Sequence, residues 1–233
     1  MKQQEENKLD KLPEKLEEHL HELGEESKVA LLDYILTVGI TIDDGFIVFF
    51  SYGSNMNEED FEKEMREAKR TLNSTLDESR LKLIKPRKRV LEGFKRTLGN
   101  RSIYHGAAFS ICPDANSRVE GICHDIYISS LPVFLKKEAM LSKNPNYRII
   151  KTEVKDENQS VLTLLGVKPK RLMDIEEKDR PKALDYVKKS IDGAERFSVD
   201  HSDMDKVANY LSGKKAVSLN QRHKLPRNKR GSK

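Results

Sequence analysis

The sequence predicts an α+β fold in which short strands curl into a small mixed β-barrel or strongly twisted sheet, flanked by helices and preceded by an N-terminal helical hairpin. Three observations predict it. An apolar, strand-like run at residues 46–50 ends in a glycine corner. Further short segments rich in β-branched residues follow, separated by turn residues. Amphipathic segments with helical spacing lie before, between and after these strands.

The length of 233 residues suits one substantial core with a helical extension rather than two full domains. We divide the chain into a helical extension at 1–44, a main domain at 45–205, and a basic segment at 206–233 that begins with the end of the last helix. Charged residues make up 35% and aromatic residues 6%, so we expect a modest core and well-solvated helices.

The net charge of +5 is unevenly distributed along the chain. Nine of the 43 Lys and Arg residues lie from Lys206 onwards, where there is no acid. Residues 1–205 therefore carry 34 basic and 38 acidic groups, a net charge of −4. The basic pI of 9.0 belongs to the tail and says little about the folded part.

No window approaches 18 uncharged apolar residues, and the first residues lack the apolar stretch of a signal peptide. We expect a cytoplasmic protein without membrane contact. The two cysteines, Cys112 and Cys123, are expected as buried thiols on two strands, with a disulfide or metal pair as the alternative. The six histidines form no ligand-spaced group, so no metal site is predicted.

An amphipathic helix is predicted at 8–23, where leucines recur every three or four residues. Gly24 ends it. A second helix follows through Val29 and Leu36 and ends near Gly39. This hairpin packs on the main domain or pairs with a second subunit, which would make a homo-oligomer.

The stretch from Phe46 to Asn57 predicts a buried strand, a tight loop and the start of a helix. Gly53 allows the backbone to approach a ligand closely, and Ser54 and Asn55 can satisfy donors of the loop and of the helix start. Backbone N–H groups clustered at such a corner favour a carboxylate or a developing oxyanion. The alternative is a turn selected only for its backbone geometry.

The middle of the chain predicts a helix at 58–76, a solvated basic linker at 85–89 that could also bind phosphate, and a strand that starts at 90–94. Strands are predicted at 105–112 and 120–128, and turn residues at 113–117 would make them antiparallel neighbours.

Residues 130–141 predict a helix with Pro132 in its first turn. A strand pair follows at 147–154 and 160–165, then helices at 181–197 and 203–211. The Lys- and Arg-rich chain beyond Gly213 is expected to be disordered.

Glu138 is an unusual acid, because it stands beside Leu135 and Ala139 and four residues after Phe134. A carboxyl group held against apolar walls keeps its proton more readily, which suits it to proton transfer near neutral pH. The alternative is a solvated carboxylate on a helix surface.

Several features together resemble the γ-glutamylcyclotransferase superfamily, over about residues 46–205. They are the strand ending in Tyr52-Gly53-Ser54-Asn55-Met56, the segments Leu91-Glu92-Gly93-Phe94 and Val119-Glu120-Gly121-Ile122, the helix with Glu138, the strand begun by Tyr147, and Gly193-Ala194-Glu195 late in a C-terminal helix.

The resemblance implies a small mixed barrel that converts a γ-glutamyl amine or amino acid into 5-oxoproline and the free amine, without metal or cofactor. It implies Glu138 as the acid and base. The substrate-binding residues that it implies are Tyr52, Gly53, Ser54, Asn55, Met56 and Tyr147. The backbone at 53–55 would hold the α-carboxylate or the oxyanion, Tyr52 would wall the pocket, and Tyr147 would hydrogen-bond Glu138 or the substrate.

The sequence departs from the family pattern around Glu138. Lys136 and Lys137 precede it where the family has Leu-Asp, and Ala139 follows it in place of Gly. The two lysines are expected to point to water, although an ammonium close to Glu138 would favour its ionised form. His124 stands where an aromatic residue is common.

Two other functions are compatible with the sequence. A catalytically inactive binding or scaffold protein of the same fold would explain the substitutions around Glu138. The acid-free tail could instead contact nucleic acid, weakly and in a salt-sensitive way, because no aromatic residue is interleaved with its basic residues.

Overall fold

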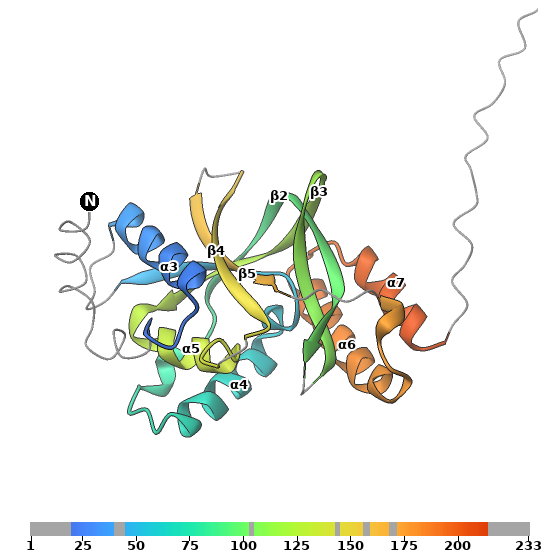
Figure 1. Cartoon of the computed structure of the whole chain (residues 1–233), viewed down its shortest axis with the longest axis horizontal. Helices are drawn as coiled ribbons and strands as arrows, with labels where there is room; N and C mark the ends of the chain where they lie inside the picture. Colours follow the sequence, from blue (N-terminus) through green and yellow to red (C-terminus); the bar gives the residue numbers. More distant parts are fainter. Residues whose placement is uncertain are drawn as a thin grey trace, which may run out of the picture.

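The structure is a computed structural model that describes residues 20–39, 45–102, 105–142, 145–155, 159–167 and 172–213. In this part of the chain a five-stranded mixed sheet curls into a half-barrel with helices around it (Figure 1). The predicted α+β fold class is confirmed. Most of the helix predicted at 8–23 and the tail beyond Gly213 lie outside the described residues.

The sheet has the strand order β2-β3-β1-β5-β4. The strands are β1 (Phe46–Ser51), β2 (Ile84–Ser102), β3 (Gly106–Tyr127), β4 (Tyr147–Val154) and β5 (Gln159–Gly166). β1 is the central strand, antiparallel to β3 and parallel to β5. This position explains its uninterrupted apolar run, since both faces of a central strand are covered.

The helices are α3 (Glu25–Val38), α4 (Glu58–Thr71), α5 (Leu131–Lys137), α6 (Arg180–Arg196) and α7 (Ser202–Leu211). α3 lies beside β4, α4 and α5 lie together, and α6 and α7 pack at the end of the molecule formed by β2 and β3 (Figure 1). The predictions of α6 and α7 are confirmed to within one residue at the N-terminus of each helix. No described helix is long and apolar enough to cross a bilayer.

α3 is the second helix of the predicted hairpin and packs on its own chain. The backbone N–H of Ile149 on β4 donates to Ser27 Oγ at 3.0 Å, and Lys151 pairs with Asp33 at 2.7 Å. Gly39 ends α3 with a left-handed φ of 67°, as expected for a C-cap glycine.

Two sequence predictions about the sheet are wrong. Residues 85–89, expected as a solvated linker, lie within β2, and Arg87 and Lys88 pair with β3. The two strands expected at 105–112 and 120–128 are parts of one strand, β3. Cys112 and Cys123 therefore lie on the same strand, neither forms a disulfide in the described structure, and Cys123 is the one of the two that is fully buried.

The expected turn at 113–117 is an excursion of β3 that does not reverse the chain. In the β2–β3 ladder Phe94 pairs with Pro113 and Glu92 with Arg118, so residues 114–117 stand opposite Gly93 alone. Gly93 has a φ of 78°. Pro113 and the turn residues after it are tolerated because the ladder is already interrupted there.

The helix predicted at 130–141 is also wrong at its C-terminal end. α5 stops at Lys137, and Ala139 turns the chain with a left-handed φ of 53°. The N–H of Met140 donates to the carbonyl of Leu135 at 2.9 Å, which closes the helix end. Glu138 is therefore the C-cap residue of α5.

Candidate active site

One cavity of about 520 Å³ opens between the end of β1, α4, the end of α5, β4 and α6. Six of the seven site residues expected from the sequence line it: Tyr52, Gly53, Ser54, Asn55, Glu138 and Tyr147. Met56 is not among the lining residues, because it is fully buried in the core beneath the loop. The loop and the carboxylate, 83 positions apart in the chain, meet at this cavity.

Tyr52 directly follows the last residue of β1 and is anchored to the neighbouring strand, β5. Its hydroxyl donates to the carbonyl of Leu164 on β5 at 2.6 Å. Burial, with smaller contributions from Tyr186 and Glu138, raises the pKa of Tyr52 well above its usual value. Tyr52 is therefore a neutral wall of the cavity.

Close packing against α6 fixes the loop after Tyr52. A Cβ on Gly53 would lie 2.6 Å from the Tyr186 hydroxyl, and one on Gly193 would lie 2.5 Å from backbone atoms of Met56 and Asn57. A Cβ at Gly193 would therefore displace the backbone of the loop or the helix, and one at Gly53 would displace the Tyr186 side chain. Asn57, rather than Ser54 or Asn55, caps α4, and its Oδ1 accepts from the N–H of Asp60 at 3.2 Å.

Arg96 of β2 supports the loop from the opposite side. Its side chain is 2% exposed and donates to the carbonyl of Tyr52 at 2.9 Å and to that of Glu120 at 2.5 Å. A further nitrogen bonds both carboxylate oxygens of Asp203 on α7, at 2.7 and 2.8 Å. One guanidinium thus connects β1, β2, β3 and α7.

Glu138 faces the loop across the cavity. Its carboxylate oxygen Oε1 accepts from Asn55 Nδ2 at 2.8 Å and from Lys137 Nζ at 2.7 Å. The side chain is 11% exposed. The side-chain amide of Asn55 therefore positions the Glu138 carboxylate.

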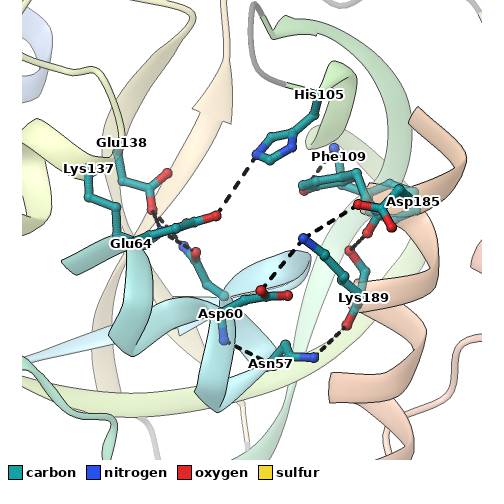
Figure 2. Close-up of polar contacts among 12 residues, drawn as sticks. Asn57, Asp60, Glu64, His105, Phe109, Lys137, Glu138, Asp185 and Lys189 are labelled. Carbon is teal, nitrogen blue, oxygen red and sulfur yellow. Dashed lines mark hydrogen bonds and ion pairs between the residues drawn. The ribbon is translucent and has the colours of Figure 1, made fainter. Parts of the chain in front are cut away.

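Lys137 points into the cavity, so the expectation that it points to water is wrong. Its ammonium, 3% exposed, contacts Glu138, Asn55 Oδ1 at 2.6 Å and Glu64 Oε2 at 3.0 Å. Figure 2 shows Lys137, Glu138 and Glu64 converging from α4 and the end of α5.

The opposite charges of Lys137, Glu138 and Glu64 stabilise one another. Burial alone would lower the pKa of Lys137, but the carboxylates of Glu138 and Glu64 outweigh burial and raise it. Burial alone would raise the pKa of Glu64, but the Lys137 ammonium outweighs it and lowers that pKa. Lys137 and Glu64 are therefore both charged near neutral pH, despite their burial.

Two tyrosines and a histidine complete the walls. The hydroxyl of Tyr147 donates to the carbonyl of Phe109 at 2.9 Å, and that of Tyr186 accepts from the Phe109 N–H at 3.1 Å. Tyr147 is therefore hydrogen-bonded to the backbone of β3 rather than to Glu138. His105 lies 4.0 Å from Glu64, and burial lowers its pKa (Figure 2).

His124 is fully buried behind the cavity, between the rings of Phe49 and Phe61. Its Nε2 and Ser51 Oγ are 2.9 Å apart, whereas its Nδ1 has no hydrogen-bond partner within the described structure. Burial, and secondarily the charges of Lys137 and Arg87, lower its pKa to about 3. His124 is therefore neutral at ordinary pH.

The arrangement can bind a polar ligand and exchange a proton with it. One carboxylate is held at the end of a helix, opposite a backbone loop, with aromatic walls on either side. Among the described residues, no three His, Cys, Asp or Glu side chains gather in a way that could hold a metal ion. The polar side chains that line the cavity offer acid–base and hydrogen-bonding chemistry.

Four titratable residues that line the cavity were not predicted as site residues from the sequence: Glu64, His105, Lys137 and Tyr186. Glu64 is one of many acids on α4, and periodicity cannot tell which of them turns toward a cavity. Tyr186 has the spacing of an ordinary core residue on α6. Lys137 stands out in the sequence beside Glu138, but it was expected to point to water.

No protein-family model matches the chain, and no curated protein matches it. Solved structures do match. YkqA from Bacillus subtilis is 18% identical with a TM-score of 0.51, and the match covers 76% of this chain but 57% of the YkqA chain. This likeness shows a shared fold.

Two further structures match with lower TM-scores. A structure described as gamma-glutamyl cyclotransferase is 17% identical with a TM-score of 0.48, over 70% of this chain and 86% of that one. An uncharacterized protein from Homo sapiens is 18% identical with a TM-score of 0.45, over the same shares of the two chains.

Proposed function

We propose, from the premise that this chain has a γ-glutamylcyclotransferase-like fold, that it is a cyclotransferase for a small γ-glutamyl compound. The products are 5-oxoproline and the free amine or amino acid. The observation that carries the proposal is the hydrogen bond of 2.8 Å between Asn55 of the loop and Glu138, which joins the two halves of the expected site in one cavity.

The reaction needs no attacking side chain, because the nucleophile is the α-amine of the substrate. The enzyme must fold the γ-glutamyl chain so that this nitrogen faces the γ-carbonyl carbon. Its main contribution to the rate is therefore to orient the two reacting groups. The backbone at Gly53, Ser54 and Asn55 would hold the α-carboxylate or the oxyanion. Tyr52 and Tyr147 would line the cavity on either side of the folded substrate.

Glu138 would move the protons. The α-ammonium loses two protons as it becomes the ring N–H of 5-oxoproline. Glu138 takes one as the nitrogen–carbon bond of the ring forms and passes it to the departing amine as the original amide bond breaks, and the other proton leaves to solvent. Oε1 is anchored by Asn55 and Lys137. No hydrogen bond within the described chain engages Oε2, so this oxygen is the one that would meet the substrate.

The test is to incubate the purified protein with a panel of γ-glutamyl amino acids and amines and to measure release of 5-oxoproline. Glu138→Gln keeps the size of the side chain but cannot accept the proton, so we expect kcat to fall by about 10² to 10⁴-fold. The matched control is Glu67→Gln on the exposed face of α4, which should keep wild-type activity. Equal turnover by Glu138→Gln and wild type would disprove the role of Glu138.

A binding protein without turnover is the second candidate, and the contact between Lys137 and Glu138 favours it. A carboxylate oxygen that already accepts a hydrogen bond from an ammonium at 2.7 Å is less available to a substrate. This candidate predicts that γ-glutamyl compounds bind, by calorimetry, while none of the panel releases 5-oxoproline. Release of 5-oxoproline that depends on Glu138 would exclude it.

A further inference from the structure

We propose that Lys137 is a positioning residue: supported by Glu64, it fixes the orientation of the Glu138 carboxylate that proton transfer requires and places a compensating positive charge beside it. This inference rests on the proposed cyclotransferase function. It adds to that function a buried cation next to the base and a second carboxylate that holds the cation.

The contacts form a closed triangle. Lys137 Nζ donates to Asn55 Oδ1 at 2.6 Å and to Glu138 Oε1 at 2.7 Å, and Asn55 Nδ2 donates to the same Oε1 at 2.8 Å. Both donors use one oxygen, so the carboxylate cannot rotate without breaking two hydrogen bonds. The other oxygen, Oε2, is thereby held toward the cavity.

Glu64 completes the support of the ammonium. Its Oε2 lies 3.0 Å from Lys137 Nζ, so the three hydrogens of the ammonium have three acceptors: Asn55, Glu138 and Glu64. An ammonium that is 3% exposed and fully hydrogen-bonded cannot turn away to water. Lys137 is therefore part of the cavity wall.

The charges explain why both partners are needed. The ammonium lies between two carboxylates, so the group carries one net negative charge, and without Lys137 the two carboxylates would lie near each other uncompensated. The other titratable groups facing this cluster are Tyr52 at the end of β1, His105 before β3, His124 on β3, and Tyr186 and Lys189 on α6. None of them touches the ammonium within the described chain.

The experiment compares Lys137→Met and Glu64→Gln by the pH dependence of kcat/KM. Loss of the ammonium should move the ascending limb of the profile to higher pH, by about 1 to 3 pH units, because one of the two uncompensated carboxyls keeps its proton longer. Loss of the Glu64 charge should move the same limb to lower pH, because the Lys137 ammonium then interacts with the charge of Glu138 alone. A merely structural role would produce no opposite shifts.

The matched control is Lys136→Met, which removes an equal charge from the neighbouring residue of α5 without touching the cavity. Its profile should stay that of the wild type. Circular dichroism on every variant checks folding, and Glu64→Gln keeps the test decisive if Lys137→Met does not fold. A limb that stays in place in the folded variants would overturn the inference while leaving the cyclotransferase proposal intact.

A second readout separates the two proposals. If the wild type releases no 5-oxoproline, the proposed function fails, and a ¹³C NMR titration of Glu side-chain carboxyls still tests Lys137. The resonance lost in Glu138→Gln is that of Glu138. We expect its midpoint to rise in Lys137→Met and to fall in Glu64→Gln; unchanged midpoints in both variants would overturn the inference.

Discussion

At the scale of single residues, the site depends on Ala139, whose left-handed backbone ends α5 directly after Glu138. A residue with a Cβ pays about 1 to 2 kcal/mol for this conformation, whereas glycine does not. The Ala139 side chain is exposed, so its methyl group adds little packing that could offset the strain.

Ala139→Gly should therefore stabilise the protein, by about 1 kcal/mol after allowance for the greater freedom of glycine in the unfolded chain. The measurement is the urea midpoint at equilibrium. Ala68→Gly, a buried position inside α4 with ordinary helical geometry, should lower the midpoint instead. A midpoint for Ala139→Gly at or below that of the wild type would contradict the assigned strain.

Residue types predicted part of the site. Tyr52, Gly53 and Asn55 could be predicted because a strand that ends in a glycine corner limits the local geometry, and Glu138 because an acid stands out beside apolar neighbours. Lys137 and Glu64 could not, since their roles arise from a contact between α4 and the end of α5. A charged residue near an apolar stripe points to water or to a cavity, and only tertiary packing decides which.

At the scale of elements, the loop after β1 is held by three neighbours that the sequence does not connect. α6 meets it at Gly53 and Gly193, β5 meets it through Tyr52, and β2 reaches it with Arg96. Arg96 is the one that also binds α7, through Asp203.

Arg96→Met should loosen this junction. It removes the part-buried hydrogen bonds to the carbonyls of Tyr52 and Glu120, so we expect a loss of about 2 kcal/mol of unfolding free energy. The loss is not larger because Asp203, at 47% exposed, can be rehydrated. Urea titration measures it, and KM for a γ-glutamyl substrate should rise as the loop shifts.

Lys95→Met is the control for Arg96→Met. Lys95 is the preceding residue of β2, and its side chain is 53% exposed in a pair with Asp114. Exposed ion pairs contribute little to stability, so its removal should change the unfolding free energy little and KM not at all. Equal effects of the two substitutions would contradict the role of Arg96 in supporting the loop.

Some element boundaries were predicted from one chain segment and others were not. The helix predicted at 58–76 ends at Thr71, because Asn73 turns the chain with a left-handed φ of 49°. Gly39 marks the end of α3, and Pro181 lies in the first turn of α6, as expected. β3 was divided in two because Pro113 and the residues after it have the composition of a turn. Whether such residues reverse a chain depends on the partner strand, and here the bulge opposite Gly93 accommodates them.

At the scale of the whole molecule, the buried His124 couples stability to pH. Its pKa is about 3 in the folded protein and near 6.5 in the unfolded chain. Below pH 6.5 the His124 side chain binds a proton in the unfolded state, whereas in the folded state it does so only near pH 3. The stabilisation is therefore complete above pH 6.5 and is lost as the pH falls through this window.

His124→Phe should remove this dependence, because the ring keeps its place between Phe49 and Phe61 without a group to protonate. Between pH 6 and pH 4 the wild type should lose about 1.4 kcal/mol of unfolding free energy per pH unit more than the variant. Urea unfolding across this range gives the slope. His21→Gln, at an exposed position, should keep the wild-type slope, and parallel slopes for His124→Phe and wild type would refute a buried neutral histidine.

The central position of β1 also bears on how the molecule folds. Ser51 meets His124 across 73 positions of the chain, and Tyr52 meets Leu164 across 112, so neither contact can form before long loops close. Such high contact order slows folding, whereas β2 and β3, neighbours in sequence, can pair early. During synthesis the cavity cannot take shape until β5 has emerged, and the partly made chain exposes the apolar edge of β1 to aggregation until then.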